Sequence, residues 1–164
     1  TMSQGAIFAN MHSKVRDLTR WYLSLLKTVD PYSQVDVNGI RLNSIYWLVA
    51  HLTWAENMLI LKATGGNPVD APWLEHYRLG GDGTLHTHNP DLKAALKLLK
   101  EVHELSQAHL LTLPDEKMEQ NNLIGFGFGG DNTNRMMIQH CIRHEAMHTG
   151  HLSWLCKIHR IESV

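Results

Sequence analysis

The sequence predicts an all-α protein, a four-helix bundle with two long connections. Three observations predict this class. Apolar residues recur at intervals of three and four along four separate segments, which is the spacing of one buried helix face. Glycine and proline gather in two stretches between these segments and favour loops there. Strand-like alternation is confined to a weak pattern over residues 32–41, which we interpret as an extended linker. We therefore expect a single domain over residues 1–164.

The first two helices follow from their apolar stripes. The first stripe begins at Ile7 and includes Met11, Leu18, Tyr22 and Leu26. Its helix should end at Asp30-Pro31, because proline disfavours helical backbone in the residue before it. The second helix should begin at Ile45, with Asn43 or Ser44 as its N-cap, and stop at Gly65-Gly66.

The third and fourth helices are each preceded by a loop. Residues 67–88 carry two prolines and three glycines and show no steady period, so we expect a long connection. Asn89-Pro90 then supplies an N-cap and a first-turn proline for the third helix, which Pro114 closes. After a second loop over residues 115–132, Asp131 or Thr133 should cap a fourth helix that runs to about Ile161.

Composition excludes several classes of protein. The formal charge is −1 with both signs interspersed, so we expect no nucleic-acid surface. No apolar run reaches the roughly 18 residues of a membrane span, and the first residues lack the order of a secretory signal. Cys141 and Cys156 both lie in helical patterns, so we expect no disulfide and a soluble protein in the reducing cytoplasm.

The unusual feature is the histidine content of 12, with four histidines between His140 and His151. The helical period places His144 and His148 on the buried face of the fourth helix. Burying an imidazole costs about 1–3 kcal/mol unless it finds a hydrogen bond or a metal ion. Two imidazoles one turn apart can converge on one ion, and His51 can reach it from the second helix. We therefore predict a metal site of His51, His144 and His148.

The alternative is that these are core histidines satisfied by hydrogen bonds or water. His103 lies in the apolar stripe of the third helix. Its role is open: it could be a fourth ligand, a hydrogen-bond partner of a ligand or a packed ring. The roles of His140 and His151, beside the pair on the fourth helix, are also left open. Surface or loop positions are expected for the other six histidines, His12, His76, His86, His88, His109 and His159.

His144, Glu145 and His148 also match H-E-x-x-H, the signature of zinc proteases. A protease would need a third ligand farther along the chain, but the sole later carboxylate, Glu162, lies too far down the same helix. A di-iron site would need a second E-x-x-H motif, which is missing. Glu145 is a tentative catalytic residue that hydrogen-bonds a ligand or a metal-bound water. The alternative is a solvated carboxylate.

Two stretches resemble the signature regions of the DinB-like family of damage-inducible proteins. They are NSIYWLVAHLTWAEN around His51 and HEAMHTGHL beginning at His144. The family's second region typically reads H-x-x-x-H, a small residue and glutamine; here Gly150 matches the small residue and His151 replaces glutamine. The resemblance implies a four-helix bundle, often dimeric, with zinc, nickel or iron held by His51, His144 and His148. It also implies transferases or isomerases that depend on low-molecular-weight thiols.

The predicted function is that of a metal-dependent transferase that brings a low-molecular-weight thiol to a small electrophilic substrate. Three neutral imidazoles do not reduce the double positive charge of the metal ion, and they leave at least one coordination position free for water or substrate. The thiol should come from solution, and Cys141 is either a core residue or an occasional ligand. The alternative function is a non-catalytic, stress-related bundle protein with a structural or sensory metal.

Aromatic residues and glycines suggest further features of the site. Aromatic helix faces favour a homodimer. Four tryptophans can wall an apolar pocket or simply pack in the core and at interfaces; they are Trp47, Trp54, Trp73 and Trp154. The glycine-rich stretch over residues 122–132 is either a plain loop or a lid near the metal.

Overall fold

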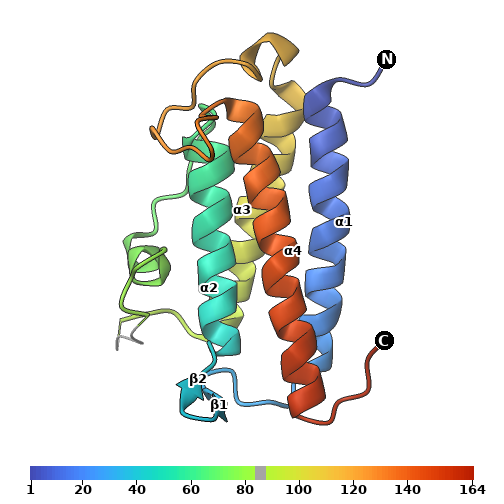
Figure 1. Ribbon diagram of the computed structural model, residues 1–164, viewed down its shortest axis with the longest axis vertical. Coiled ribbons are helices and arrows are strands. Elements are labelled where there is room, and N and C mark those ends of the chain that lie inside the picture. The colour runs from blue at the N-terminus through green and yellow to red at the C-terminus, as the bar shows by residue number, and fades with distance from the viewer. Residues whose placement is uncertain (84–87) are drawn as a thin grey trace.

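The structure is a computed structural model that describes residues 1–83 and 88–164, so His86 lies outside the described residues. The described chain is mostly helical, and its four α-helices lie side by side (Figure 1). The helices are α1 (Gln4–Leu25), α2 (Ile45–Glu56), α3 (Leu92–Thr112) and α4 (Asn134–Ile158). A π-helical stretch, η1 (Asn57–Lys62), continues α2, and the short 3₁₀ helices η2 (Pro72–Tyr77) and η3 (Asp115–Lys117) lie in the two long connections.

The stretch predicted to be an extended linker contains a small antiparallel hairpin instead. Its strands are β1 (Asp36–Val37) and β2 (Ile40–Arg41). Asn38 and Gly39 connect them with positive φ angles of 54° and 84°, as a type I′ turn requires. The Asn-Gly pair was therefore a stronger signal than the weak alternation around it.

Side-chain caps set the helix starts. Ser44 accepts a hydrogen bond from the backbone N–H of Trp47, and Thr133 accepts one from that of Met136, so both predicted caps are confirmed. The predicted cap Asn89 is wrong, because the Asp91 side chain accepts from the Ala94 N–H and α3 begins after it.

Two helices end earlier than predicted. Helix α1 ends at Leu25 and is followed by a turn. At the end of α4, Arg160 has a φ of 55°, and the N–H of Ile161 donates to the carbonyl of Cys156. Together with the bond from the Arg160 N–H to the Lys157 carbonyl, this is a Schellman motif. It stops the helix at Ile158.

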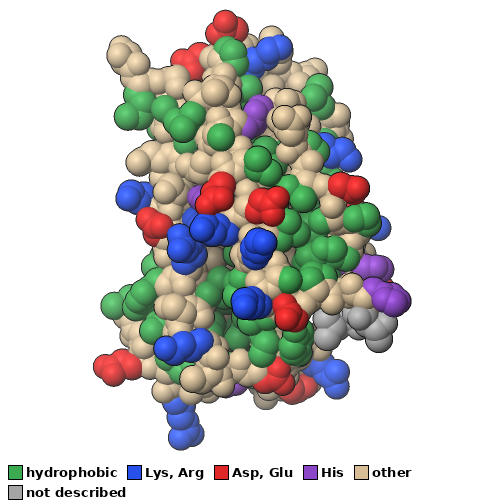
Figure 2. All heavy atoms as spheres, turned by 180° about the vertical axis from the view of Figure 1, so that it is seen from behind, with side chains coloured by type: hydrophobic (Ala, Val, Ile, Leu, Met, Phe, Trp, Pro, Cys, Tyr) green, Lys and Arg blue, Asp and Glu red, His purple; other side chains and the backbone are tan. Residues whose placement is uncertain are grey.

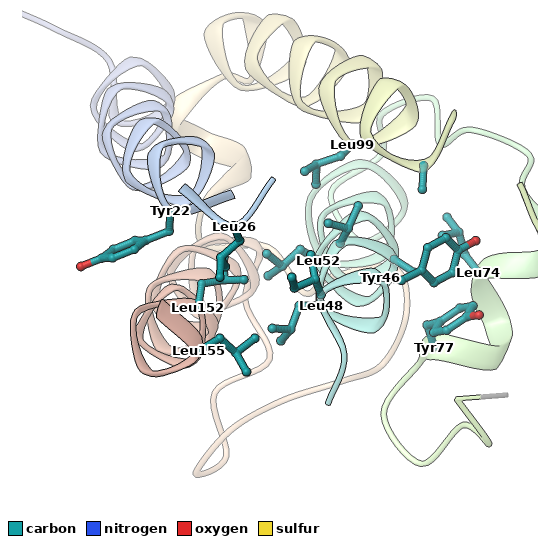
Figure 3. Packing of buried hydrophobic residues seen from close by; sticks show 14 of the residues in the cluster. Tyr22, Leu26, Tyr46, Leu48, Leu52, Leu74, Tyr77, Leu99, Leu152 and Leu155 are labelled. Carbon is teal, nitrogen blue, oxygen red and sulfur yellow. The ribbon is translucent and has the colours of Figure 1, made fainter. Parts of the chain in front are cut away.

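The buried core consists of two apolar clusters. Figure 3 shows the first cluster, where Leu152 and Leu155 of α4 face Leu48 and Leu52 of α2. The second cluster lies towards the other end of the helices and includes Ala55, Leu59, Leu110, Met137, Ile138 and Cys141. On α1, α3 and α4 buried polar residues lie between the two clusters in sequence.

The buried face of α1 differs in part from the predicted stripe, of which Tyr22 and Leu26 lie in the first cluster as expected. Ile7, Met11 and Leu18 were expected to face the core, but each is 45–49% exposed. The residues that α1 buries are instead Gly5, Ala9, His12, Arg16, Thr19 and Tyr22. A helix can bury this polar face because groups on the other three helices supply its hydrogen bonds.

Charges are mixed on the surface. The face seen in Figure 2 carries Lys and Arg side chains among Asp and Glu side chains. Among the described helices, none combines the length and the apolar character that crossing a bilayer demands.

Candidate metal centre

Three histidines from two helices meet as the sequence predicts. The Nε2 atom of His51 on α2 lies 3.0 Å from Nε2 of His144 on α4, and Nε2 of His148 lies 3.1 Å from the same atom. All three histidines offer donor atoms within 4.8 Å of one another. Two nitrogens bound to one tetrahedral ion at 2.0–2.1 Å lie about 3.3 Å apart. The spacing therefore suits one metal ion.

Aromatic packing orients His51. The Trp47 ring, one turn earlier on α2, stacks on the His51 ring with a centroid distance of 4.3 Å and an interplanar angle of 20°. Trp54 lies nearly parallel to the same ring, with centroids 5.8 Å apart. Because both neighbours are large and rigid, the imidazole plane is held before any ligand binds.

Hydrogen bonds select the tautomers of the histidines. The Nδ1–H of His51 donates to the backbone carbonyl of Tyr77 at 2.5 Å, so its Nε2 keeps a free lone pair. Nδ1 of His148 lies 3.1 Å from Nδ1 of His151, and donation from His148 frees its Nε2 in the same way. Among the described residues, Nδ1 of His144 is buried without a hydrogen-bond partner. Hydrogen-bond partners such as the Tyr77 carbonyl and His151 orient histidines that bind metals.

Burial keeps the three imidazoles neutral. It lowers the pKa of His148 to about 3, with a further contribution from the neighbouring His144 and His51. Burial, followed by His51 and His140, lowers the pKa of His144 to about 4. The pKa of His51 is also lowered by burial, although the Tyr77 carbonyl opposes the shift. Neutral imidazoles at pH 7 present the lone pairs that a metal needs.

The three histidines lie in the wall of a cavity of about 900 Å³. Helix α2, η1, α4 and the two long connections all contribute to it. Its lining is mainly apolar: Trp47, Trp54, Ala55, Met58, Leu59, Leu79, Leu123, Ile124, Phe126, Phe128 and Met147. Lys62 and Arg78 add positive charge, and no Asp or Glu of the described chain lines it.

Two of the four tryptophans have the predicted role in the wall of the pocket. Trp47 and Trp54 wall the cavity. Trp73 packs on Tyr46 with ring centroids 6.3 Å apart, and Trp154 is exposed. The glycine-rich loop brings Phe126 and others to the cavity; whether it moves as a lid stays a prediction.

His140 also lines this cavity, a role the sequence left open. Its Nδ1 accepts a hydrogen bond from Nε of Arg143 at 3.1 Å, so Nε2 carries the ring hydrogen. Burial, followed by the Arg143 charge, lowers the pKa of His140 to about 4. The ring packs on Phe128 with centroids 3.9 Å apart. It therefore supplies a neutral N–H donor to the cavity wall.

Glu145 lies inside the core, away from the cavity. The side chain is 2% exposed, which rules out a solvated carboxylate. Its oxygens accept hydrogen bonds from Nε of Arg16 at 2.7 Å, from His12 at 2.7 Å and from Thr19 at 2.9 Å. It does not line the cavity. Glu145 is therefore an ion-pair partner of Arg16 inside the core, and its tentative catalytic role stays a prediction.

Two further histidines belong to the same buried network. His12, expected at the surface, is fully buried. Nδ1 of His103 lies 2.8 Å from the Glu56 carboxylate, so this residue is not a fourth ligand of the three-histidine cluster. The signal that could have revealed the network is the polar series His12, Arg16 and Thr19, spaced three and four apart on α1.

Cys141 packs in the second apolar cluster, as the core reading predicts. It is fully buried, and burial raises the pKa of its thiol well above the usual value. Neither Cys141 nor Cys156 lines the cavity.

Comparison with known proteins agrees with this arrangement. The family model described as the DinB superfamily matches residues 12–152, which include all three converging histidines. A search of curated proteins found no match. Since the family match spans most of the sequence, the chain belongs to the DinB superfamily.

Proposed function

We propose that the four α-helices form a four-helix bundle whose His51, His144 and His148 hold a divalent transition-metal ion for catalysis on a small molecule. The observation that carries this proposal is the meeting of three Nε2 atoms in the wall of a cavity of about 900 Å³. Facing helices of bundles commonly build such sites. Imidazole ligands suit zinc, nickel and iron.

The reaction we propose is transfer or isomerisation with a low-molecular-weight thiol. When bound, the ion supplies Lewis acidity, which lowers the pKa of a coordinated thiol or water. The thiol has to come from solution because Cys141 and Cys156 lie in the helical core and away from the cavity.

The cavity lining suggests the kind of electrophile. Apolar walls such as Trp47 and Phe126 bury an apolar substrate body and exclude water from it. Lys62 and Arg78 favour an anionic group on the same molecule. The Nε2–H of His140 is a hydrogen-bond donor for a substrate oxygen.

One observation favours the second candidate, a non-catalytic protein with a sensory or structural metal. The described lining of the cavity contains no carboxylate that can act as a general base. The two candidates differ in whether a coordination position exchanges with solutes, since a structural zinc site is closed.

Cobalt substitution tests the proposal. Cobalt-loaded protein should show a visible spectrum that changes when a low-molecular-weight thiol is added. His148→Ala should lose both the corresponding equivalent of metal and the thiol response, whereas the matched variant His159→Ala, on an exposed histidine at the end of α4, should keep both. A spectrum that no thiol perturbs would exclude the enzyme and leave the closed metal site.

A homodimer is part of the same proposal. The apolar stripe of α1 that faces outward supports it, with Ile7, Met11, Leu18 and Trp21 each more than a third exposed. A second copy of the chain would cover this stripe. Light scattering should then give twice the chain mass of 18.7 kDa, and Met11→Lys should return the single mass.

A further inference from the structure

We infer that a second metal ion binds inside the helical core, on His12 of α1, Glu56 of α2 and His103 of α3. This site is separate from the three-histidine cluster and shares no residue with it. It would tie three helices together, whereas the first site joins only α2 and α4. The inference does not depend on the proposed function.

The three side chains converge on one point. Nδ1 of His103 lies 2.8 Å from Oε1 of Glu56, and Nδ1 of His12 lies 3.6 Å from the same oxygen. The two imidazole rings meet edge to face, with centroids 4.9 Å apart and an angle of 89°. Donor atoms of all three residues lie within 4.8 Å of one another, close enough for one ion.

The hydrogen bonding of His12 indicates a binding site for a cation. Its Nε2 lies 2.7 Å from Oε2 of Glu145, and an ionised carboxylate only accepts, so Nε2 carries the hydrogen. The other nitrogen, Nδ1, is buried and has no hydrogen-bond partner among the described residues. In a neutral ring, Nδ1 carries a lone pair, and this lone pair faces the carboxylate oxygen of Glu56. Two facing acceptors need a positive ion between them.

The separation of the two atoms favours a metal ion over a proton. A hydrogen bond between a ring nitrogen and a carboxylate oxygen spans about 2.7–3.2 Å, shorter than the 3.6 Å between His12 and Glu56. Two donors on one tetrahedral ion lie about 3.3–3.5 Å apart. The gap between His12 and Glu56 therefore matches shared coordination better than a shared proton. The 2.8 Å between His103 and Glu56 is a hydrogen-bond distance, and the ion would replace this bond when it binds.

The charges of the network also leave room for a cation. Glu56 and Glu145 are two buried carboxylates, and in the described part of the chain they share one guanidinium partner, Arg16, at 2.6 Å from Glu56 and 2.7 Å from Glu145. Arg16 donates a hydrogen bond to Oε2 of Glu56, whereas Oε1 of the same carboxylate faces His12 and His103. Removing a single buried negative charge from water without compensation is costly, so the second carboxylate needs its own positive partner.

The donor set defines the class of ion. Two imidazole nitrogens and one carboxylate oxygen suit zinc, iron(II) or manganese, whereas calcium and magnesium prefer oxygen ligands alone. The Ser106 hydroxyl donates to Oε1 of Glu56 and so orients the carboxylate. Only His103 reaches the surface, with its side chain 14% exposed. The site is thus closed, which is typical of a structural ion.

Metal counting tests this inference. Protein purified from zinc-supplemented cells should contain two zinc ions per chain by mass spectrometry, and His103→Gln should contain one. His148→Ala should also contain one, and the double variant none. His109→Gln, on the same helix but outside both clusters, is the matched control and should keep two.

Each other result has a definite meaning. One zinc in both the wild type and His103→Gln would show that a proton alone occupies the core cluster and would overturn the inference. Two zinc ions in both would place the second ion elsewhere and would overturn it as well. Failure of the three-histidine site is visible separately, because His148→Ala would then match the wild type.

A second measurement covers the case in which His103→Gln does not fold. Anomalous scattering at the zinc edge from wild-type crystals should give a peak between His12, Glu56 and His103, in addition to any peak at the three-histidine cluster. Absence of density there in zinc-loaded crystals would contradict the proposal.

Discussion

His151 determines which nitrogen of His148 is available to a metal. The two Nδ1 atoms lie 3.1 Å apart, and one of them must donate. If His148 donates, its Nε2 is bare and faces Nε2 of His144, 3.1 Å away. A residue that accepts a hydrogen at position 151 therefore supports metal binding, and the glutamine typical of the family also offers an acceptor oxygen.

Substitution of His151 tests this role. We expect His151→Ala to weaken metal binding at the three-histidine cluster roughly 10- to 100-fold, as loss of a hydrogen-bond partner of a ligand commonly does. His151→Gln should restore the affinity, because its amide oxygen can accept from His148. Competition with a chelating dye measures both. Equal affinities for the alanine variant and the wild type would show that His151 is only a surface residue.

At this scale, the sequence predicted residues that act within one helix better than those that depend on several. His144 and His148 could be predicted because a spacing of four fixes their common face. Glu145 could not, because its burial depends on Arg16 and His12, more than a hundred positions earlier in the chain. A polar residue looks exposed until its partners are known.

Among the elements, α1 departs most from its pattern. Part of its apolar stripe, namely Ile7, Met11 and Leu18, faces outward, whereas Tyr22 and Leu26 of the same stripe lie in the first cluster. The polar series of the helix faces the core. Periodicity gives the direction of an apolar face but not what covers it, so the sequence predicted the helix and part of its buried face and missed the polar residues buried beside it. The π-helical turn of η1 was missed for a related reason, since the apolar residues of 57–62 also fit an α-helix. Such turns often occur at functional sites, and Met58 and Leu59 line the cavity.

The loop of residues 122–132 forms one cavity wall, and its backbone is tightly folded. The Asn122 side chain donates to the carbonyls of Phe126 and Asn132 at 2.6 and 2.7 Å. A Cβ atom added at Gly127 would lie 2.8 Å from the Asp131 carbonyl oxygen. Backbone rather than a side chain limits the space, so the loop has to shift to accept any larger residue.

We expect Gly127→Ala to destabilise the protein by about 1–3 kcal/mol, the usual range for a strained backbone. The matched variant is Gly150→Ala on α4, where an added Cβ meets no atom within 4 Å. Because alanine favours a helix interior over glycine, this variant should gain up to about 1 kcal/mol. Urea denaturation gives both values. A Gly127→Ala protein as stable as the wild type would mean that the loop yields freely.

For the molecule as a whole, the two apolar clusters follow from the sequence pattern, but the polar network between them does not. It takes residues from all four helices, including Arg16, Glu56, His103 and Glu145. Helical content and the positions of the long connections could be predicted from local signals. The network required knowledge of which helices are neighbours, because each of its members looks unfavourable in the core on its own.

This network makes the free energy of unfolding depend on pH in the acidic range. Burial alone would raise the pKa of Glu145, but Arg16 and His12 more than offset it and hold the pKa at about 2, below its ordinary value of 4.5. Arg16, with His12 and His103, likewise keeps the pKa of Glu56 below its usual range against burial. A carboxyl with a depressed folded pKa stabilises the fold above its unfolded pKa, and this stability is lost as the pH falls through the folded pKa.

The contribution of Glu145 to the free energy of unfolding of metal-free protein, on the order of 3 kcal/mol, should therefore be lost between about pH 4.5 and pH 2. This loss adds to an earlier one that begins below the ordinary histidine pKa of 6.5, because His140, His144 and His148 have lowered pKa values in the folded protein. Glu145→Gln should be less stable at neutral pH, because it leaves Arg16 without one ion pair, and its pH dependence should be flatter over the same interval. Thr19→Val removes a hydrogen bond to Glu145 without removing a charge, so it should lower the whole curve and keep its slope. Urea titrations at successive pH values measure all three proteins. Parallel curves for the wild type and Glu145→Gln would show that Glu145 titrates alike in the folded and unfolded chains, and Arg16 could then not be its ion-pair partner in solution.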